Sequence, residues 1–355
     1  MPNIFSKIKL PGAKDRFSIG LDIGTQSIKC VKLKINNSAI ELVAFDLEES
    51  QLDPVEVLKK IKHAQSADLV NISFCGSATV IRYVNFLRMS KPELKQALKF
   101  EAQKHIPFSL DEVNLDAEIL IDGLPENKML VLIAALKKEF VQQRLKSLEA
   151  AGLRPNIIDI DSLALVNAFN FNYPKIEVPE HKPEGSGLPS DRQSHKSICL
   201  LNIGSTISNI SIIDNGIPRL SRDIHSGGAN FTKKLMDIFG IDFKAAEELK
   251  IAPTDPEKAD KVKVGVESVL TNLASEIRTS FDYYESQNTS NVARIFLSGG
   301  GGKISGLKEM LAGSLGIEVE SWDPFKQIKI SDSIDEAKLN QFSSQFNVAV
   351  GLALR

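Results

Sequence analysis

The same pattern of apolar and polar positions occurs twice in this chain, 180 residues apart. Residues 19–33 read IGLDIGTQSIKCVKL, and residues 199–213 read CLLNIGSTISNISII, so the two superpose without a gap. In each copy an apolar run leads into a turn of glycine and hydroxyl residues, and a second run follows with two-residue alternation, which predicts a β-hairpin. Hairpins with glycine turns are common. Two ungapped copies with the same polar turn predict two similar α/β lobes.

Between the two hairpins, the pattern predicts an alternating block of strands and helices. The expected strands cover residues 68–76, 79–87, 113–121 and 129–136, and the expected helices cover 92–105 and 137–151. Ser90 is a suitable N-cap for the first helix, Pro107 ends it, and Gly152 closes the second. This block reads as an inserted two-layer subdomain. A strand over 156–161 and a helix through Phe169 follow it.

The second half of the chain opens with a segment of different composition. Residues 172–197 contain four prolines and two glycines and predict a flexible loop. After the second hairpin we expect a Gly-Gly turn at 227–228, a helix from Phe231 and a long helix over 262–285. A strand at 294–298 then runs into four consecutive glycines, and a helix is expected from Ser305.

Composition removes several classes of function. A length of 355 residues predicts about two domains. The 43 Lys and Arg against 45 Asp and Glu give a net charge of −2, which provides no cationic field for nucleic acid. No apolar run approaches the ~20 residues of a membrane span, and residues 1–9 lack the apolar core of a signal peptide. The three cysteines and five histidines show neither CxxC nor metal-ligand spacing, so we expect a reduced, cytoplasmic protein.

Four glycine turns are the candidate chemistry of the chain, at residues 24–27, 204–206, 227–228 and 299–302. Phosphate binding needs backbone N–H groups that converge, and glycine lets the backbone approach a ligand closely. The sequence contains neither a GxxxxGK[ST] P-loop nor a GxGxxG that opens a helix after a strand. A GxSxG nucleophile turn is also absent. The turns therefore predict phosphate binding by several separate segments.

The order of these motifs resembles the actin/Hsp70/sugar-kinase ATPase superfamily. Residues 22–29 (DIGTQSIK) resemble its phosphate-1 motif, residues 202–206 (NIGST) resemble phosphate-2, and residues 299–307 (GGGGKISGL) resemble the adenosine motif. Asp161 falls where the first connecting motif has an acidic residue, and residues 348–354 (VAVGLAL) resemble the second connecting helix. The five matches fall in family order over nearly the whole chain.

Within this superfamily the sequence is most similar to PilM-type proteins, the actin-like proteins of type IV pilus assembly that are related to the division protein FtsA. Residues 100–120 (FEAQKHIPFSLDEVNLDAEIL) carry this resemblance. It implies an α/β fold of the actin-like (actin/Hsp70/FtsA) type, duplicated into two lobes. The implied parts are a tail at 1–16, a first lobe at 17–49 and 153–171, an inserted subdomain of the FtsA 1C type at 50–152, a loop at 172–197, and a second lobe at 198–355 that returns to the first at about 342–355. The short tail suits either a frayed terminus or a weak membrane or partner contact.

The resemblance also implies a site for ATP and Mg²⁺ gripped by both lobes. Two hairpin turns would hold the phosphates through Gly24, Thr25, Gln26, Ser27, Lys29, Gly204, Ser205 and Thr206. Other positions would line the sugar and base: Gly227, Gly228, Glu276, Gly299, Gly300 and Gly301. The oxygen donors for hydrated Mg²⁺ would be Asp22, Asp161 and Asn202. For Lys29, a solvated strand position is an equally good interpretation.

The sequence departs from the superfamily at phosphate-2, where an aspartate is usual and this chain has Asn202. A neutral amide binds metal-bound water less strongly than a carboxylate, and hydrolysis needs the metal and water held firmly. No lysine or arginine is identifiable from the sequence as a transition-state group. We therefore expect nucleotide binding with slow or absent turnover.

The partner that the resemblance implies is the short N-terminal cytoplasmic tail of PilN, an inner-membrane protein, with other inner-membrane and motor components of the pilus machine. The chain would then act in pilus biogenesis and twitching motility at the cytoplasmic face of the inner membrane. The docking surface is expected on the inserted subdomain, where Phe100, Ile106, Pro107 and Phe108 form an apolar cluster, although such a cluster equally suits a core beneath the helix end. An FtsA-like polymerising or membrane-tethering protein and a phosphotransferase of the same superfamily are the alternatives.

Overall fold

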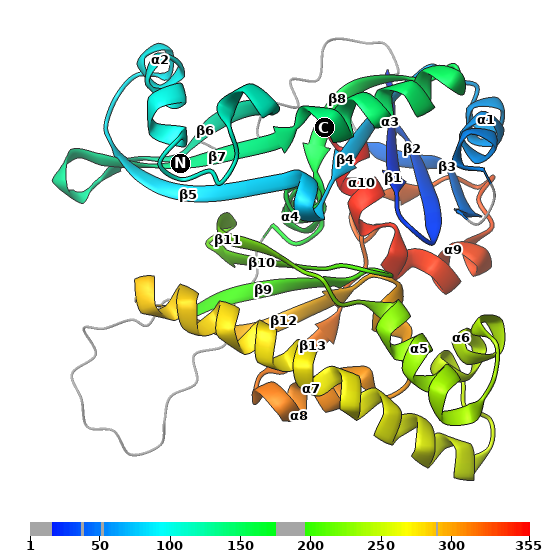
Figure 1. Cartoon of the computed structure of the whole chain (residues 1–355). Coiled ribbons are helices and arrows are strands. Elements are labelled where there is room, and N and C mark those ends of the chain that lie inside the picture. Colours follow the sequence, from blue (N-terminus) through cyan, green and yellow to red (C-terminus); the bar gives the residue numbers. More distant parts are fainter. Residues whose placement is uncertain (1–15, 37–38, 51–52, 175–195, 289) are drawn as a thin grey trace, which may run out of the picture. The chain divides into compact units, whose positions relative to one another are not determined.

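The computed structural model describes residues 16–36, 39–50, 53–174, 196–288 and 290–355 (Figure 1). The N-terminal tail and most of the loop predicted at 172–197 lie outside these residues. Two compact units divide the chain: unit 1 holds Met1–Ala168 and Pro324–Arg355, and unit 2 holds Phe169–Asp323.

A six-stranded mixed sheet forms the centre of unit 1, in the order β14-β3-β2-β1-β4-β8. The strands are β1 (Arg16–Ile23), β2 (Ser27–Ile35), β3 (Ile40–Glu49), β4 (Leu69–Phe74), β8 (Arg154–Ile160) and β14 (Lys329–Ile330). The first three form an antiparallel meander, and the other three join in parallel. The predicted hairpin at 19–33 is confirmed, and its register places Asp22 opposite Lys29. The pairing of β14 with β3 means that the chain is back in unit 1 by Lys329.

Helices cover both faces of this sheet. On one face, Ile19 and Leu21 of β1 share a core with α1 (Pro54–Gln65) and α3 (Lys138–Ala150). Because side chains alternate along a strand, Gly20 faces the other way, against α10 (Asn347–Ala353). A Cβ on Gly20 would lie 1.9 Å from the carbonyl oxygen of Ala349, so only glycine allows this approach. Two further helices of the chain are α4 (Asp161–Asn172) and α9 (Glu336–Phe342).

A separate three-stranded sheet, in the order β5-β7-β6, belongs to the inserted block. Its elements are β5 (Thr79–Leu87), α2 (Lys91–Ala102), β6 (Val113–Leu124) and β7 (Lys128–Lys137), which confirms the strands and helix expected there. Alternate residues of the apolar strand β7, such as Val131 and Ile133, pack with Leu94 and Leu98 of α2. The subdomain sheet spans 79–137, whereas α1, β4 and α3 pack in or on the six-stranded sheet.

Unit 2 is built on a five-stranded sheet in the order β11-β10-β9-β12-β13. The strands are β9 (Lys196–Ile203), β10 (Ser208–Asp214), β11 (Ile217–Ile224), β12 (Asn291–Ser298) and β13 (Glu318–Ser321). The helices are α5 (Gly228–Phe239), α6 (Phe243–Ile251), α7 (Pro256–Gln287) and α8 (Leu307–Leu315). Apolar residues of β9 and β10 share one core with α5, α7 and α8. The second predicted hairpin and the long helix are both confirmed.

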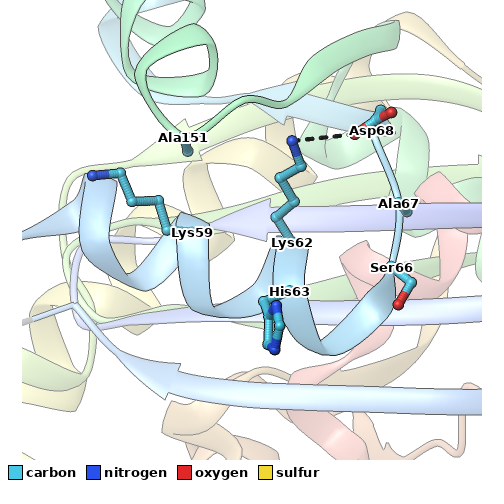
Figure 2. Close-up of a pocket in the computed structure, with 7 residues that line it drawn as sticks. All are labelled: Lys59, Lys62, His63, Ser66, Ala67, Asp68 and Ala151. Atoms are coloured by element: carbon cyan, nitrogen blue, oxygen red, sulfur yellow. Dashed lines mark ion pairs between the residues drawn. The ribbon is translucent and has the colours of Figure 1, made fainter.

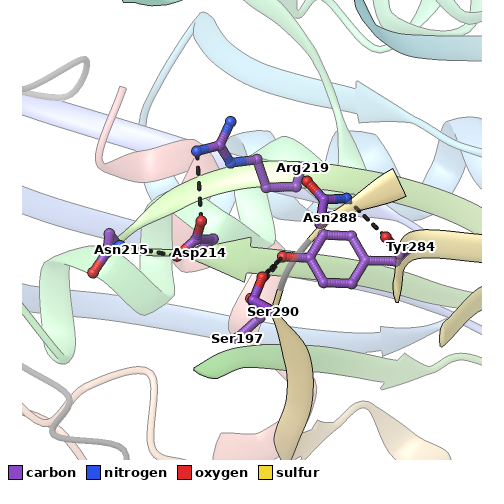
Figure 3. A network of polar contacts seen from close by, with 7 residues as sticks. All are labelled: Ser197, Asp214, Asn215, Arg219, Tyr284, Asn288 and Ser290. Atoms are coloured by element: carbon purple, nitrogen blue, oxygen red, sulfur yellow. Dashed lines mark hydrogen bonds and ion pairs between the residues drawn. The ribbon is translucent and has the colours of Figure 1, made fainter. Parts of the chain in front are cut away.

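A buried triangle of hydroxyl groups joins three elements of unit 2 (Figure 3). The Tyr284 Oη atom of α7 lies 2.7 Å from Ser197 Oγ of β9 and 2.7 Å from Ser290 Oγ just before β12. The two serine hydroxyls are also 3.2 Å apart, and all three residues are buried. Each hydroxyl therefore has partners despite its burial, and the triangle ties the helix end to the strand starts.

Candidate functional site

The turn between β1 and β2 is closed by its own backbone. The Gly24 N–H donates to the Ser27 carbonyl oxygen at 3.1 Å, and the Gln26 carbonyl accepts from the Ser50 N–H at 2.8 Å. The Ser50 hydroxyl also donates to the Gly24 carbonyl oxygen at 3.1 Å. Thr25 lies exposed at the tip. The tip of the turn is therefore accessible at Thr25, while the carbonyl groups of Gly24 and Gln26 accept hydrogen bonds from Ser50.

Asp22 and Lys29 form an ion pair beside this turn. The Lys29 Nζ atom lies 3.1 Å from Asp22 Oδ2, and both side chains are largely buried. Lys29 is thus paired rather than solvated on its strand. The pair places one cation and one carboxylate directly next to the Gly24 backbone, since a Cβ on Gly24 would lie 3.1 Å from Lys29 Nζ.

Arg144 of α3 brings a second cation to the same region of unit 1. Its guanidinium carbon lies 5.2 Å from the centre of the Phe74 ring. Burial lowers the pKa of Arg144, and the charges of Asp161 and Asp22 raise it in part. Asp161 is the first residue of α4, directly after β8. The two acidic residues predicted for unit 1 therefore lie close enough to act on one arginine, which the sequence did not single out.

The turn between β9 and β10 in unit 2 is closed by the same backbone hydrogen bond as the turn in unit 1. The Gly204 N–H donates to the Ile207 carbonyl oxygen at 3.0 Å, at positions 180 residues after Gly24 and Ser27. Asn202 lies opposite Asn209 in the register, as Asp22 lies opposite Lys29. Here an amide pair replaces the ion pair, because Asn202 Nδ2 donates to Asn209 Oδ1 at 3.0 Å.

The Asn202 amide belongs to a chain of hydrogen bonds with a fixed direction. Asn209 Nδ2 donates onward to Asp223 Oδ1 at 2.7 Å. The Asn202 Oδ1 atom accepts from the Ser298 hydroxyl at 3.3 Å. The Asn202 side chain therefore donates through Nδ2 to Asn209 on β10 and accepts through Oδ1 from Ser298 on β12. An aspartate at this position could accept both hydrogen bonds but could donate neither.

The other predicted glycine turns of unit 2 pack against this hairpin turn. The Gly228 N–H donates to the Gly204 carbonyl oxygen at 2.8 Å. A Cβ on Gly227 would lie 2.5 Å from the Ser205 carbonyl oxygen. Gly299 has a φ of +85°, and its Cβ would lie 2.4 Å from the Ile203 carbonyl oxygen. The structure thus brings three of the predicted turns together, with Gly300 and Thr206 exposed and Gly301 against Ile203.

Lys250 of α6 holds these turns together, and the sequence analysis missed it. Its ammonium donates to the Gly228 carbonyl oxygen at 3.3 Å, to Thr232 Oγ1 at 2.7 Å and to Glu247 Oε1 at 2.5 Å. Its own carbonyl oxygen accepts from the Ser305 N–H at 3.0 Å. Burial lowers the pKa of Lys250, while the hydrogen bond and charge of Glu247 raise it in part. The signal in the sequence is the spacing of Glu247 and Lys250, three residues apart on one helix face.

Glu276 lies in a different setting from the glycine turns with which it was grouped. Its Oε2 atom lies 2.5 Å from Arg222 Nη2, so the residue ties α7 to β11. The Arg222 Nη1 atom also donates to the Ser280 hydroxyl at 3.0 Å.

The donors in these turns suit an anion and a hydrated cation. Backbone N–H groups at glycine turns, and lysine and arginine side chains such as Lys29 and Arg144, are the kinds of donor that bind phosphate in proteins. Asp22, Asp161 and the amide oxygen of Asn202 are hard oxygen donors of the kind that Mg²⁺ accepts, usually with several waters retained. Within the described parts of the chain, no three His, Cys, Asp or Glu side chains cluster as a metal cage. Cys30 and Cys199 are buried free thiols, and burial raises the pKa of each.

A cavity of about 450 Å³ lies elsewhere in unit 1 (Figure 2). Lys59, Lys62 and His63 of α1, the segment Ser66–Asp68 and Ala151 line it. Lys62 Nζ pairs with Asp68 Oδ1 at 3.2 Å across it, and the predicted nucleotide residues take no part in its lining.

None of the helices among the described residues is both long enough and apolar enough to cross a bilayer.

The repeated hairpin, the two mixed sheets and the inserted subdomain define an actin-like α/β protein. A family model described as "Type IV pilus assembly protein PilM" matches residues 20–355. The chain therefore belongs to the PilM family of type IV pilus assembly proteins.

Solved structures agree with this fold. The chain is similar to a solved "PilM-PilN type IV pilus biogenesis complex", with a TM-score of 0.79, 23% sequence identity, and coverage of 95% of this chain and 98% of that chain. It is also similar to the ethanolamine utilization protein EutJ from Carboxydothermus hydrogenoformans, with a TM-score of 0.53, 14% identity, and coverage of 97% and 92%. At these identities the likeness concerns the fold.

Proposed function

We propose that this chain is a nucleotide-binding scaffold of the type IV pilus assembly machinery. The observation that carries the proposal is the repeated turn, in which Gly24 of unit 1 and Gly204 of unit 2 make the same backbone hydrogen bond. That bond uses the N–H groups of Gly24 and Gly204, so an anion would be bound by other backbone N–H groups of the two turns. The family supplies the pilus context, and the actin-like fold makes ATP the ligand to test first.

The proposed metal is Mg²⁺, held through its waters by Asp22, Asp161 and Asn202. Their oxygen atoms fit the donor set that hydrated Mg²⁺ takes. When bound, the ion supplies positive charge to the phosphates. Asn202 is neutral and already hydrogen-bonded to Asn209 and Ser298, so it holds a metal-bound water weakly. We therefore propose that turnover is slow or absent and that ATP acts as a conformational ligand.

The proposed partner is the cytoplasmic N-terminal segment of a PilN-type inner-membrane protein. Similarity to a chain of a solved PilM–PilN complex and membership of the family support this choice. Such a partner would place the chain at the cytoplasmic face of the inner membrane. A flexible segment loses conformational entropy on docking, so its affinity is expected to be moderate.

The proposed docking surface is the subdomain of β5, α2, β6 and β7. In the apolar cluster predicted there, Ile106 is buried in the subdomain core, and Phe108 packs against that core with the Lys137 ammonium 4.5 Å from its ring centre. These two residues therefore serve packing. Phe100 differs, because 76% of its surface is exposed on α2. Phe100 and Pro107 are the exposed members of the cluster, and Phe100 is its exposed aromatic residue.

Titration of the whole chain with a synthetic PilN-type tail peptide, with and without ATP, tests this function. Phe100→Ser should weaken the peptide about fivefold or more, since an exposed aromatic anchor typically carries a large share of binding energy. Phe17→Ser is the matched control, because Phe17 is also exposed, at 54%, but lies on β1. Absence of peptide binding would refute the partner, and equal effects of the two substitutions would refute the docking surface.

A further inference from the structure

The outer face of α2 carries two lysines for which the described chain provides no carboxylate. Lys95 and Lys99 are exposed, and neither makes an ion pair or a hydrogen bond with any residue that the structure describes. They are four residues apart, so they lie on one side of the helix, where two like charges destabilise it. Both charges are therefore accessible to an anionic ligand from outside the chain.

The remaining charges of α2 already have partners. Lys91 pairs with Glu118 of β6 at 2.7 Å, and Lys104, just after the helix, pairs with Glu101 at 2.9 Å. Glu93 is held in the capping box at the start of the helix. The helix and Lys104 together have four lysines and two glutamates, a local excess of positive charge in a chain whose net charge is −2.

The two unpaired lysines lie beside the exposed Phe100. Gln96 and Phe100 are also four residues apart and exposed, and they form a second row next to the row of lysines. The opposite side of the helix is buried against the three-stranded sheet (Figure 1). The outer surface of a helix is convex, and the cavity described above lies at α1 instead. A lipid surface needs no groove, so it fits this face better than a further peptide segment does.

We propose that Lys95 and Lys99 bind anionic headgroups of the membrane while Phe100 contacts the tail of the membrane partner. This inference rests on the proposed docking of that tail at Phe100 and deepens it. A short tail that leaves the bilayer and docks at Phe100 brings this side of α2 towards the lipid. The cytoplasmic leaflet carries anionic lipids, which attract lysines near its surface. Because one membrane holds both the tail and the lipids, the two contacts strengthen each other.

Co-sedimentation of the whole chain with vesicles tests this role. One set of vesicles is phosphatidylcholine alone, and the other is phosphatidylcholine with anionic phosphatidylglycerol at about 3:1. Both sets carry the same density of a lipid-anchored PilN-type tail peptide, so the contribution of the tail cancels in the comparison. Wild-type protein should bind the anionic vesicles about tenfold more tightly, because each lysine near an anionic surface adds to the affinity.

The double variant Lys95→Met with Lys99→Met should reduce this preference to about twofold or less. Its affinity for the soluble tail peptide should stay unchanged. Methionine is a good helix former and the like charges are removed, so α2 should remain folded.

The matched control is Lys261→Met with Lys263→Met. Both lysines are exposed on α7 of unit 2, and their removal changes the net charge of the chain by the same amount. This variant should keep the preference for anionic vesicles.

The outcomes separate the inference from the proposed function. Equal binding of wild type to both sets of vesicles, an unchanged preference in the α2 variant, or an equal loss in the control overturns the inference alone. Loss of soluble-peptide affinity in the α2 variant also overturns it, since the lysines then bind carboxylates of the tail. Wild-type protein that does not bind the soluble tail overturns the proposed partner, and the inference falls with it. A preference lost only in the α2 variant, with unchanged soluble-peptide affinity, supports the inference.

Discussion

One pair of facing residues distinguishes the two copies of the hairpin turn. In unit 1 the pair is ionic, Asp22 with Lys29, and in unit 2 it is the amide pair Asn202 with Asn209. The backbone geometry of the two turns is shared, so the difference lies in charge. A turn with an ion pair can exchange its partners for a phosphate and a metal, whereas the amide pair of unit 2 is fixed by the onward bond to Asp223.

Substitution of Asn202 by aspartate should lower the stability of the protein and make its ATP affinity more dependent on Mg²⁺. The new carboxylate leaves Asn209 Oδ1 without a donor, so the free energy of unfolding should fall by about 1–3 kcal/mol. The added charge should make ATP affinity more dependent on Mg²⁺. Urea unfolding and titrations with and without EDTA measure the two effects. Unchanged stability together with unchanged metal dependence would contradict this assignment of Asn202.

A Cβ at Gly24 should disturb the phosphate turn without unfolding the chain. It would lie 2.9 Å from the Ser27 carbonyl oxygen and 3.1 Å from Lys29 Nζ, so Gly24→Ala should displace both and weaken ATP about tenfold. Gly313→Ala is the control. Gly313 lies in α8 with no heavy atom near its added Cβ, and alanine there should stabilise the helix by about 1 kcal/mol with unchanged ATP affinity. Equal ATP affinity of both variants would argue against a role for the Gly24 turn.

At the residue level, sequence reasoning found the turns but missed the cations behind them. Glycines and hydroxyl residues close together in the sequence predict a turn without any knowledge of the packed structure. Arg144 and Lys250 act across long sequence distances, and each appears in the sequence as an ordinary helix residue. Their roles depend on burial and on neighbours such as Phe74 and Gly228, which only the packed structure defines.

At the level of elements, a capping box of Ser90 and Glu93 fixes the start of α2. The sequence predicted Ser90 as the N-cap but not the part that Glu93 takes. The Ser90 N–H donates to Glu93 Oε2 at 2.7 Å, and the Glu93 N–H donates to Ser90 Oγ at 3.5 Å. Ser90→Ala should lower the free energy of unfolding by about 1 kcal/mol at neutral pH. Ser109→Ala is the control, because Ser109 precedes a short 3₁₀ turn without a side-chain cap and should have little effect.

The effect of this cap should depend on pH. The backbone N–H and the hydroxyl of Ser90 both donate to Glu93 Oε2 at 2.7 Å, and these two hydrogen bonds lower the pKa of Glu93 in the folded protein. A lowered pKa stabilises the fold above the glutamate's unfolded pKa, and this contribution disappears as the pH falls through the folded pKa. The stability difference between wild type and Ser90→Ala, measured by urea unfolding, should therefore narrow from pH 7 to about pH 3. A difference that stays constant over this range would show that Glu93 does not take part in the cap.

The hydroxyl triangle offers a second test at this scale. Tyr284→Phe removes two hydrogen bonds but leaves the hydrogen bond between the two serine hydroxyls, which are 3.2 Å apart. The free energy of unfolding should therefore fall by about 1–2 kcal/mol. Tyr283 is the matched control, since its side chain is 64% exposed, and Tyr283→Phe should change stability by less than about 0.5 kcal/mol. Thermal unfolding of the two variants compares them directly. A Tyr283 effect as large as that of Tyr284 would rule out the triangle as the cause.

Most long elements followed from periodicity, and the exceptions have physical reasons. The hairpins, β7 and α7 have strong apolar patterns over many residues, and each was predicted. The two-residue strand β14 has no pattern of its own and exists because β3 offers an edge to pair with. The assignment of β4 to the main sheet rather than to the insert depends on its parallel pairing with β1 and β8, which local sequence does not encode.

On the scale of the whole molecule, the duplicated pattern predicted two related units, and the fold has them. Each unit carries one hairpin turn with the same backbone closure, and each surrounds that turn with its own charged or polar groups. The net charge of the chain argued against nucleic acid as a partner but could not suggest PilN. The proposal of a PilN-type partner depended on a family motif on the inserted subdomain.

If the turns of both units bind nucleotide, ATP should protect both units from hydrogen exchange. Backbone N–H groups that donate to phosphate exchange slowly. The N–H groups of Gly24 and Gly204 already donate within their turns, so the amides at 25–27 and at 205–206 are the ones that should slow when ATP is added. The turns at 227–228 and 299–301 should follow, because they pack on the Gly204 turn. The last turns of α7, around Tyr284, lie among the hydroxyl triangle and serve as the internal control, with unchanged exchange. Exchange followed by mass spectrometry, with and without saturating ATP, gives all four regions in one experiment. Protection confined to one unit would mean that the turn of the other unit does not bind nucleotide, and the repeated turn would no longer support the proposed function.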